Sequence, residues 1–127
     1  MFLSILKSKI HRAVVTGTEI DYIGSITISQ DLMRAAGLLE YEKVHVADID
    51  NGNRFETYVI KGPAGSGQIC LNGAAAKLVK KGDKIIIMAY AQMEPGEAAA
   101  FKPRVVFVDA DNKITSVKDG EEAGAVF

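Results

Sequence analysis

Three short segments of the sequence hold the residues that are most able to carry chemistry, namely residues 22–28, 51–58 and 72–76. Conventional active-site patterns are missing. The sequence has no nucleophile elbow, no phosphate-binding glycine loop and no metal-ligand spacing among His11, His45 and the carboxylates. If the chain is an enzyme, its electrophile must therefore come from another source.

Each segment also has an ordinary structural explanation. The pair Gly24-Ser25 is a common turn signal before a strand. Arg54, Glu56 and Tyr58 share one face of a strand by the period-two rule, as the residues of an exposed polar face do. The start of the third segment fits a helix cap followed by small residues. One segment by itself therefore predicts no activity.

The composition predicts one folded domain that spans residues 1–127. Hydrophobic residues make up 48% of the chain and charged residues 24%, as in ordinary globular proteins. The formal net charge is -1. A nearly neutral chain lacks the cationic field that drives binding to phosphate backbones, so nucleic acid is not expected as a partner.

The cysteine content and the N-terminus indicate a cytoplasmic protein. Cys70 is the single cysteine, so neither an intrachain disulfide nor a zinc site of several thiolates within one chain can form. The first residues lack an apolar run long enough for a signal peptide, and no run approaches the roughly 18 apolar residues of a membrane span. We therefore expect no association with a membrane.

Short β-branched and alternating runs predict a mainly β fold with minor helix. We expect strands near residues 2–7, 10–16, 25–29, 43–49, 54–60, 68–71, 83–92 and 104–109. Two short helices are expected, one over residues 30–36 that stops at Gly37 and one over residues 73–79 that opens after Asn72. Many short strands joined by glycine-rich turns favour a small closed barrel. Residues 119–127 are weakly patterned and are expected to form a mobile tail.

Taken together and in order, the three segments resemble the aspartate 1-decarboxylase family, the pyruvoyl enzymes of β-alanine and pantothenate synthesis. The resemblance begins at Lys9-Ile10-His11-Arg12, passes through all three segments to Gly82-Asp83, and continues more loosely to about Asp111. The total length also matches. Several family motifs at family spacing across most of the chain make a chance match improbable.

The resemblance implies a six-stranded double-psi β-barrel that assembles as a homotetramer with active sites between subunits. It also implies self-cleavage between Gly24 and Ser25, which gives a β-chain of residues 1–24 and an α-chain of residues 25–127. An acyl shift from nitrogen to oxygen needs a hydroxyl beside a distorted peptide carbonyl. Glycine at position 24 suits this chemistry, because it permits backbone conformations that a Cβ would forbid. Ser25 would become a covalent pyruvoyl group, the only cofactor expected, with no metal and no pyridoxal phosphate.

Family roles carried over from the resemblance assign the remaining site residues. The pyruvoyl ketone made from Ser25 would form a Schiff base with L-aspartate and accept the electron pair released with carbon dioxide. Tyr58 would protonate the decarboxylated carbon. Thr57 would position the Gly24 carbonyl and contact substrate. The backbone of Gly73-Ala74-Ala75 would line the substrate surface.

Charged and supporting residues complete the expected site. Arg54 suits the carboxylate that stays, because a planar guanidinium can bind it through two parallel hydrogen bonds. Lys9, His11, Tyr22 and Asn72 are expected as supporting residues, with Asn72 holding the pyruvoyl end. Thr57 and Tyr58 are neighbours on a strand and normally face opposite sides, so a bulge or a subunit contact must let both reach one site.

Two other functions remain open at this point. A barrel of this fold could assemble without ever cleaving or catalysing, because fold alone does not confer function. A small β-barrel could also bind nucleic acid, which the net charge disfavours. The sequence leaves open whether an accessory protein assists cleavage.

Overall fold

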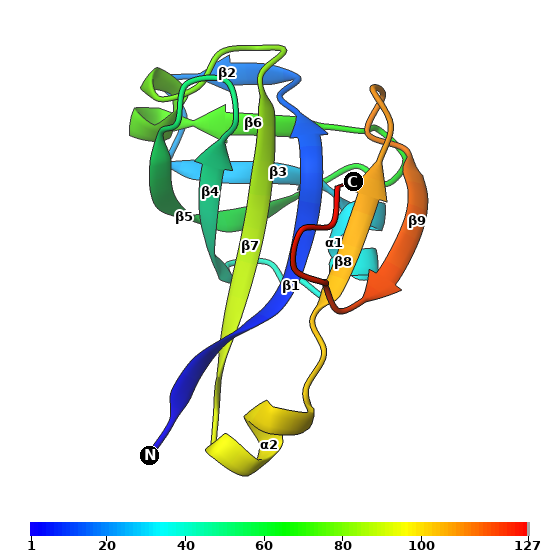
Figure 1. Ribbon diagram of the computed structural model, residues 1–127. Coiled ribbons are helices and arrows are strands. Elements are labelled where there is room, and N and C mark those ends of the chain that lie inside the picture. The colour runs from blue at the N-terminus through cyan, green and yellow to red at the C-terminus, as the bar shows by residue number, and fades with distance from the viewer. Residues whose placement is uncertain (127) are drawn as a thin grey trace.

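A computed structural model describes residues 1–126, whose strands and short helices form one curved sheet around a core (Figure 1). The strands are β1 (Leu3–Val14), β2 (Gly17–Glu19), β3 (Ser25–Ser29), β4 (Lys43–Asp48), β5 (Arg54–Gly62), β6 (Ile69–Asn72), β7 (Lys84–Met93), β8 (Arg104–Val108) and β9 (Ile114–Asp119). The helices are α1 (Gln30–Ala36), the 3-10 helix η1 (Gly73–Lys77) and α2 (Pro95–Ala100). The predicted mainly β class with short helices is confirmed.

The strand order closes a ring of six members. The order is β2-β6-β3-β5-β4-β7-β1-β8-β9, with parallel pairs β1–β8, β2–β6 and β3–β5. β1 runs almost directly into β2, yet β1 pairs with β7 while β2 pairs with β6. Counting β1 and β2 as one member therefore joins the two ends of the series. β8 and β9 lie beside this ring, next to β1.

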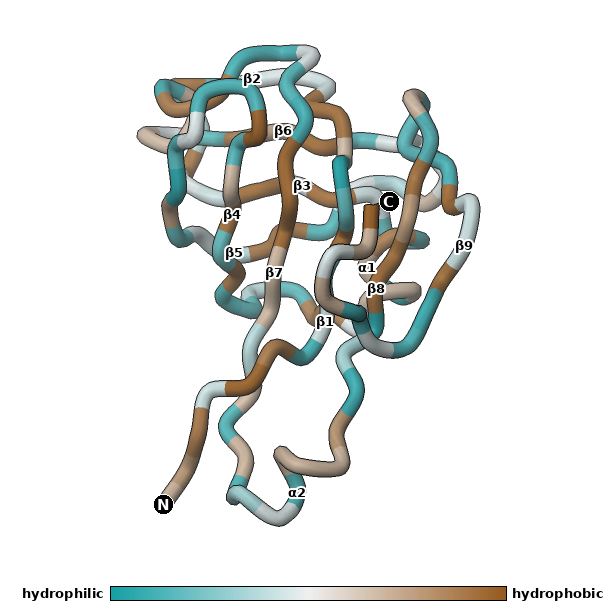
Figure 2. Tube along the Cα trace, viewed as in Figure 1, coloured by the Kyte–Doolittle hydropathy of each residue, from teal (hydrophilic) through white to brown (hydrophobic). Residues whose placement is uncertain are grey.

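Apolar side chains from β1, β3, β4, β5, β6 and β7 fill the interior. The largest fully buried ones include Ile10, Ile26, Val46, Leu71 and Ile87. The burial pattern alternates along β4 and along most of β7, as expected for strands with one inward face. In Figure 2 the hydrophobic segments follow the strands of the barrel, whereas several connections are hydrophilic. This core fixes which side chains of each strand point outward.

The first strand differs from the sequence prediction. We expected two strands with a break near residues 8–9, but β1 is continuous from Leu3 to Val14. Its pairing with β7 shifts between Leu6 and Ser8 and again between Ile10 and Ala13. Arg12, in the second shift, has a φ of 62°. Such irregularities re-aim side chains and disturb the alternation that sequence patterns rely on.

The other predicted elements agree with the structure to different degrees. The helix over residues 30–36 is confirmed, with Gly37 at its end in the left-handed region at φ 68°. The helix expected over residues 73–79 is shorter and is a 3-10 helix. The sequence analysis missed β2, α2 and β9. Short edge strands and an alanine-rich turn have too little periodicity for detection.

Part of the chain extends beyond the barrel. The start of β1 and the end of β7 form a ribbon that projects from the barrel together with α2 (Figure 1). Phe127, the last residue of the segment expected to be mobile, lies outside the described residues. Within residues 1–126, no helix has both the length and the apolar character needed to cross a membrane.

Candidate active site

A solvent-open hollow of about 600 Å³ lies at the start of β3. Its walls include four of the residues that the sequence analysis selected, Tyr22, Ser25, Tyr58 and Asn72. They come from three parts of the chain, and the sheet brings them together because β3 pairs with β5 on one side and β6 on the other. We call this hollow the Ser25 pocket.

Ser25 is the first residue of β3 and is almost completely buried, with 3% of its surface exposed. Its hydroxyl donates to the carbonyl oxygen of Ile23 at 3.2 Å. It also accepts a hydrogen bond from Asn72 Nδ2 at 2.9 Å. The preceding residue, Gly24, is exposed. A hydroxyl held in this way next to an accessible peptide can serve as an internal nucleophile.

Asn72 faces Ser25 across the antiparallel pair of β3 and β6, where the two residues are direct partners. Its side-chain nitrogen donates to Ser25 Oγ and also to Thr27 Oγ1 at 3.0 Å. Asn72 is itself buried, with 4% of its surface exposed. Buried amide groups normally find partners, and here both N–H groups are used on β3. The prediction that Asn72 supports Ser25 is therefore consistent with this geometry.

Gly73 allows the chain around Gly24 to lie against η1. Gly73 has a φ of 68°, in the left-handed region that favours glycine. A Cβ placed on Gly73 would stand 2.7 Å from Gly24 Cα, 2.9 Å from Gly24 N and 3.2 Å from the carbonyl oxygen of Tyr22. A side chain at this position would therefore displace the backbone next to Ser25. The two following residues differ, since Ala74 is exposed while Ala75 packs against the core.

Tyr58 and Thr57 point to opposite sides of β5. The register between β4 and β5 runs without a shift, with Lys43 opposite Tyr58 and Val44 opposite Thr57. Tyr58 lines the Ser25 pocket and its ring lies 6.5 Å from that of Tyr41. Thr57 is not among the residues that line it. No bulge therefore brings Thr57 to this pocket within one chain.

The predicted residues Arg54, Lys9 and His11 lie outside the Ser25 pocket. Arg54 is exposed at the start of β5, and Lys9 and His11 are on β1, three strands away from β5 in the sheet. The Lys9 ammonium forms an ion pair with Glu121 at 2.9 Å. No lysine or arginine is found among the described residues that line the Ser25 pocket, whose single charged side chain is Asp21.

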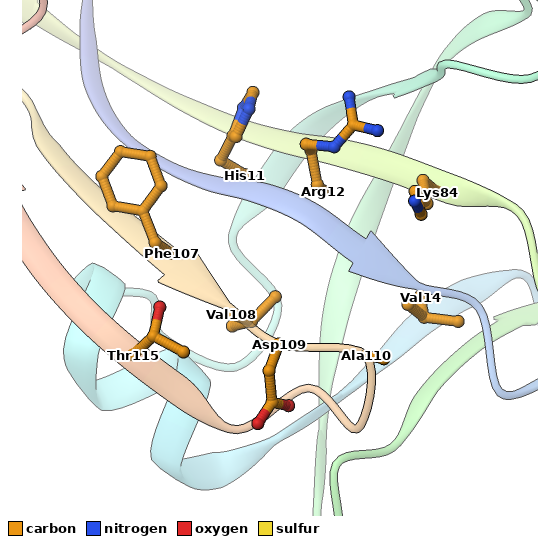
Figure 3. Close-up of a pocket in the computed structure, with 9 residues that line it drawn as sticks. All are labelled: His11, Arg12, Val14, Lys84, Phe107, Val108, Asp109, Ala110 and Thr115. Atoms are coloured by element: carbon orange, nitrogen blue, oxygen red, sulfur yellow. The ribbon is translucent and has the colours of Figure 1, made fainter. Parts of the chain in front are cut away.

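His11 lines a second hollow of about 350 Å³ between β1 and β8 (Figure 3). Arg12, Lys84 and Asp109 also line it. The ring of His11 meets that of Phe107 edge to face, with 5.7 Å between centroids. Burial lowers the pKa of His11, and the positive charges of Lys9 and Arg12 lower it further. The imidazole is thus biased toward its neutral form.

Three carboxyl groups outside both hollows could approach one cation. Oxygen atoms of Asp48, Asp50 and Asp83 lie within 4.8 Å of one another. Each of them already accepts a backbone N–H, as Asp48 does from Asp50 at 2.8 Å and Asp83 from Lys80 at 3.0 Å. These contacts give the cluster a structural role in joining the turn after β4 to the start of β7.

Comparison with known proteins identifies the family. The family model described as aspartate decarboxylase matches residues 1–115. The chain belongs to the aspartate decarboxylase family. Membership accounts for the closed six-member ring, because the barrel of this family is the double-psi barrel.

Curated relatives extend the similarity to nearly the whole chain. An aspartate 1-decarboxylase of Acetivibrio thermocellus is 60% identical over 126 residues, which are 99% of this chain and 100% of the relative. One of Caldicellulosiruptor bescii is 62% identical over 122 residues, 96% of this chain and 95% of the relative. One of Moorella thermoacetica is 58% identical over 127 residues, 100% of this chain and 99% of the relative.

The Ser25 pocket of this aspartate decarboxylase family member also contains residues that the sequence analysis did not select. Thr27, Ile60 and Tyr41 line it. The period-two rule could have found Thr27 and Ile60, because they lie two residues beyond Ser25 and Tyr58 on the same strand faces. Tyr41 has no such signal, since it comes from the loop after α1 and has a φ of 73°.

Proposed function

We propose that this chain cleaves itself between Gly24 and Ser25 and then converts L-aspartate to β-alanine and carbon dioxide, the β-alanine serving pantothenate synthesis. One observation carries the proposal. In a member of the aspartate decarboxylase family, the Ser25 hydroxyl is buried at the edge of a pocket and held by Asn72 next to an exposed glycine peptide. The names of the relatives support the same activity.

The cleavage uses groups of the chain itself. Ser25 Oγ attacks the carbonyl carbon of Gly24, the peptide C–N bond breaks, and the Ser25 nitrogen takes the proton, which leaves an ester. In the β-elimination that follows, the Cα proton of Ser25 is lost to water, the Cβ–Oγ bond breaks, and the Gly24 carboxylate leaves with Oγ. Water hydrolyses the resulting dehydroalanine to a pyruvoyl group and ammonia. Asn72 supports the first step, because its donated hydrogen bond stabilises negative charge on Oγ.

The residues around Ser25 fit a pyruvoyl group. Asn72 presents an N–H donor that suits a carbonyl oxygen, and the missing side chain of Gly73 keeps the backbone at Gly24 in place. When present, the group supplies an electrophilic carbonyl that takes the substrate amine and the electron pair left by carbon dioxide. Tyr58 is the proton donor that we assign to the product carbon, because its side chain lines the pocket.

We further propose that the working enzyme is a homotetramer whose sites lie between copies of the chain. Aspartate carries two carboxylates, yet the one charged residue lining the Ser25 pocket is the anionic Asp21. Lys9, His11 and Arg54 lie outside that pocket. A neighbouring copy can supply Lys9 and Arg54 as cations, and His11 and Thr57 with them. The absence of a second cysteine for a disulfide fits the cytoplasmic location that we propose.

Intact-mass measurement of the purified protein under denaturing conditions tests the cleavage. The wild type should give two fragments, the larger starting with pyruvoyl, and Ser25→Ala should stay one chain. A Ser25→Ala protein that still splits at the same bond would remove Ser25 as the nucleophile. A wild type that stays intact and inactive would favour the non-catalytic barrel.

Hybrid assemblies test the shared site. Light scattering should give four times the 13.6 kDa chain mass. Lys9→Ala and Ser25→Ala chains should each be weakly active or inactive alone. Co-expressed, they should regain activity, because one chain offers the matured Ser25 and the other an intact Lys9. Activity no higher than that of the better parent would contradict a site shared in this way.

A further inference from the structure

A buried polar cluster links Cys70 to Ser25 through Asn72. The antiparallel register places Ser25 opposite Asn72 and Thr27 opposite Cys70, so the four side chains share one patch of the β3–β6 surface. Cys70 is 7% exposed, Asn72 4% and Ser25 3%. In such surroundings each polar contact matters more than it would in water.

The carboxamide of Asn72 has a defined polarity. Cys70 Sγ donates to Asn72 Oδ1 at 3.3 Å, and Nδ2 of the same amide donates to Ser25 and Thr27. Turning the amide by half a revolution would exchange these roles. Oδ1 would then face the two hydroxyls and take the Ser25 proton, while Nδ2 would face the thiol. A protonated thiol disfavours this turn, because the turned amide would lose the S–H donor and would point an N–H group at sulfur, which is only a weak acceptor.

We propose that Cys70 is a positioning residue for self-cleavage, whose thiol holds the Asn72 amide with its N–H groups toward Ser25. This inference rests on the proposed self-cleavage at Gly24-Ser25. With this polarity the Ser25 proton points to the Ile23 carbonyl, and Oγ receives a donor that stabilises it as it attacks. With the opposite polarity the Ser25 proton is bound to Asn72 and Oγ has lost that donor.

The state of the thiol supports the proposal. Burial raises the pKa of Cys70, and the negative charge of Glu19 raises it further. The thiol therefore stays protonated at neutral pH and remains a donor. A thiolate would repel Asn72 Oδ1 and favour the turned amide.

Three substitutions separate the hydrogen bond from packing. Cys70→Ser keeps a donor on a similar volume, Cys70→Ala removes it, and Cys70→Val fills the space without it. Each chain would be made by cell-free synthesis, and the intact fraction followed by denaturing gel and mass spectrometry. We expect Cys70→Ala and Cys70→Val to cleave about five- to tenfold more slowly than the wild type, the effect of losing about one neutral hydrogen bond. Cys70→Ser should recover most of the rate.

A double substitution completes the test, and thermal unfolding checks that each variant is folded. On an Asn72→Ala background, Cys70→Ala should slow cleavage no further, because the residue it acts through is gone. Cleavage of Cys70→Val at the wild-type rate would overturn the proposal, as would a folded Cys70→Ser as slow as Cys70→Ala. A failure of the proposed function itself would look different. The wild type would then stay intact, or Ser25→Ala would still be cleaved.

Discussion

Gly73 and Gly24 meet backbone to backbone, and a Cβ on Gly73 would stand 2.7 Å from Gly24 Cα. Real Cβ atoms do not tolerate such a distance to backbone. The contact therefore joins η1 to the peptide that precedes Ser25, and it connects the first and third of the segments selected in the sequence.

Gly73→Ala should abolish or strongly slow self-cleavage, because the new methyl group must push the Gly24 backbone away from its position. Gly52→Ala is the matched control. Gly52 has a similar φ of 77°, but nothing lies within 4 Å of a Cβ there. Both variants should lose about 1 kcal/mol of stability from the backbone conformation. Only Gly73→Ala should lose cleavage as well, as read from the intact-chain fraction, and equal cleavage in the two would contradict the role of the contact.

Tyr58→Phe should mature normally yet form β-alanine at least about a hundredfold more slowly, the usual contribution of a positioned proton donor. Tyr90→Phe serves as control, since the Tyr90 hydroxyl lies near Met88 and outside the Ser25 pocket. Pyruvoyl content and β-alanine release should be measured on the same preparation. A fully matured Tyr58→Phe enzyme with wild-type turnover would remove Tyr58 from this role.

Arg54→Lys should lower kcat/KM for aspartate by about ten- to a hundredfold, or roughly 1.5–3 kcal/mol, because lysine keeps the charge but loses the two-pronged contact with a carboxylate. Arg34→Lys, at an exposed position in the last turn of α1, controls for loss of an arginine elsewhere. Cleavage should be unaffected in both. If matured Arg54→Lys kept its kcat/KM, Lys9 would be the next candidate for the retained carboxylate.

Asp48→Asn should stabilise the protein at neutral pH. Burial raises the pKa of Asp48, and the adjoining Asp83 carboxyl raises it further, while the hydrogen bond from Asp48 lowers the pKa of Asp83. A carboxyl whose folded pKa is raised binds its proton more tightly when folded. Its contribution to stability is therefore present below its unfolded pKa and is lost as pH rises through the folded pKa.

Asparagine can donate to Asp83 without a proton that titrates. We expect the Tm of Asp48→Asn to exceed that of the wild type by about 3–5 °C at pH 7, which corresponds to about 1 kcal/mol of unfolding free energy. This difference in Tm should shrink toward pH 4. Asp50→Asn, at the exposed member of the cluster, is the control. A gap that widens toward low pH would show that Asp48 is ionised in the folded protein.

The sequence predicted most of the barrel because local rules govern it. Alternation located β4, β5 and β7, and Gly37 marked the end of α1. The continuity of β1 was missed, because its two irregularities depend on pairing with β7, which lies about 80 residues later in the chain. The site residues were assigned from the family resemblance and not from local rules. Ser25, Tyr58 and Asn72 meet within one chain, whereas no local pattern could reveal that Lys9 and Arg54 lie outside their pocket.

The closure of the ring through β1 and β2 has a consequence for the mature protein. Both strands belong to residues 1–24, and they contact β7, β8 and β6. After a cut at Gly24-Ser25 the small fragment is therefore one complete member of the ring, held without a covalent link. A protein denatured before the cut can refold from a single molecule. After denaturation of the cleaved protein, the two fragments must associate again, so the recovery of folded protein should depend on concentration. The cut therefore makes unfolding harder to reverse.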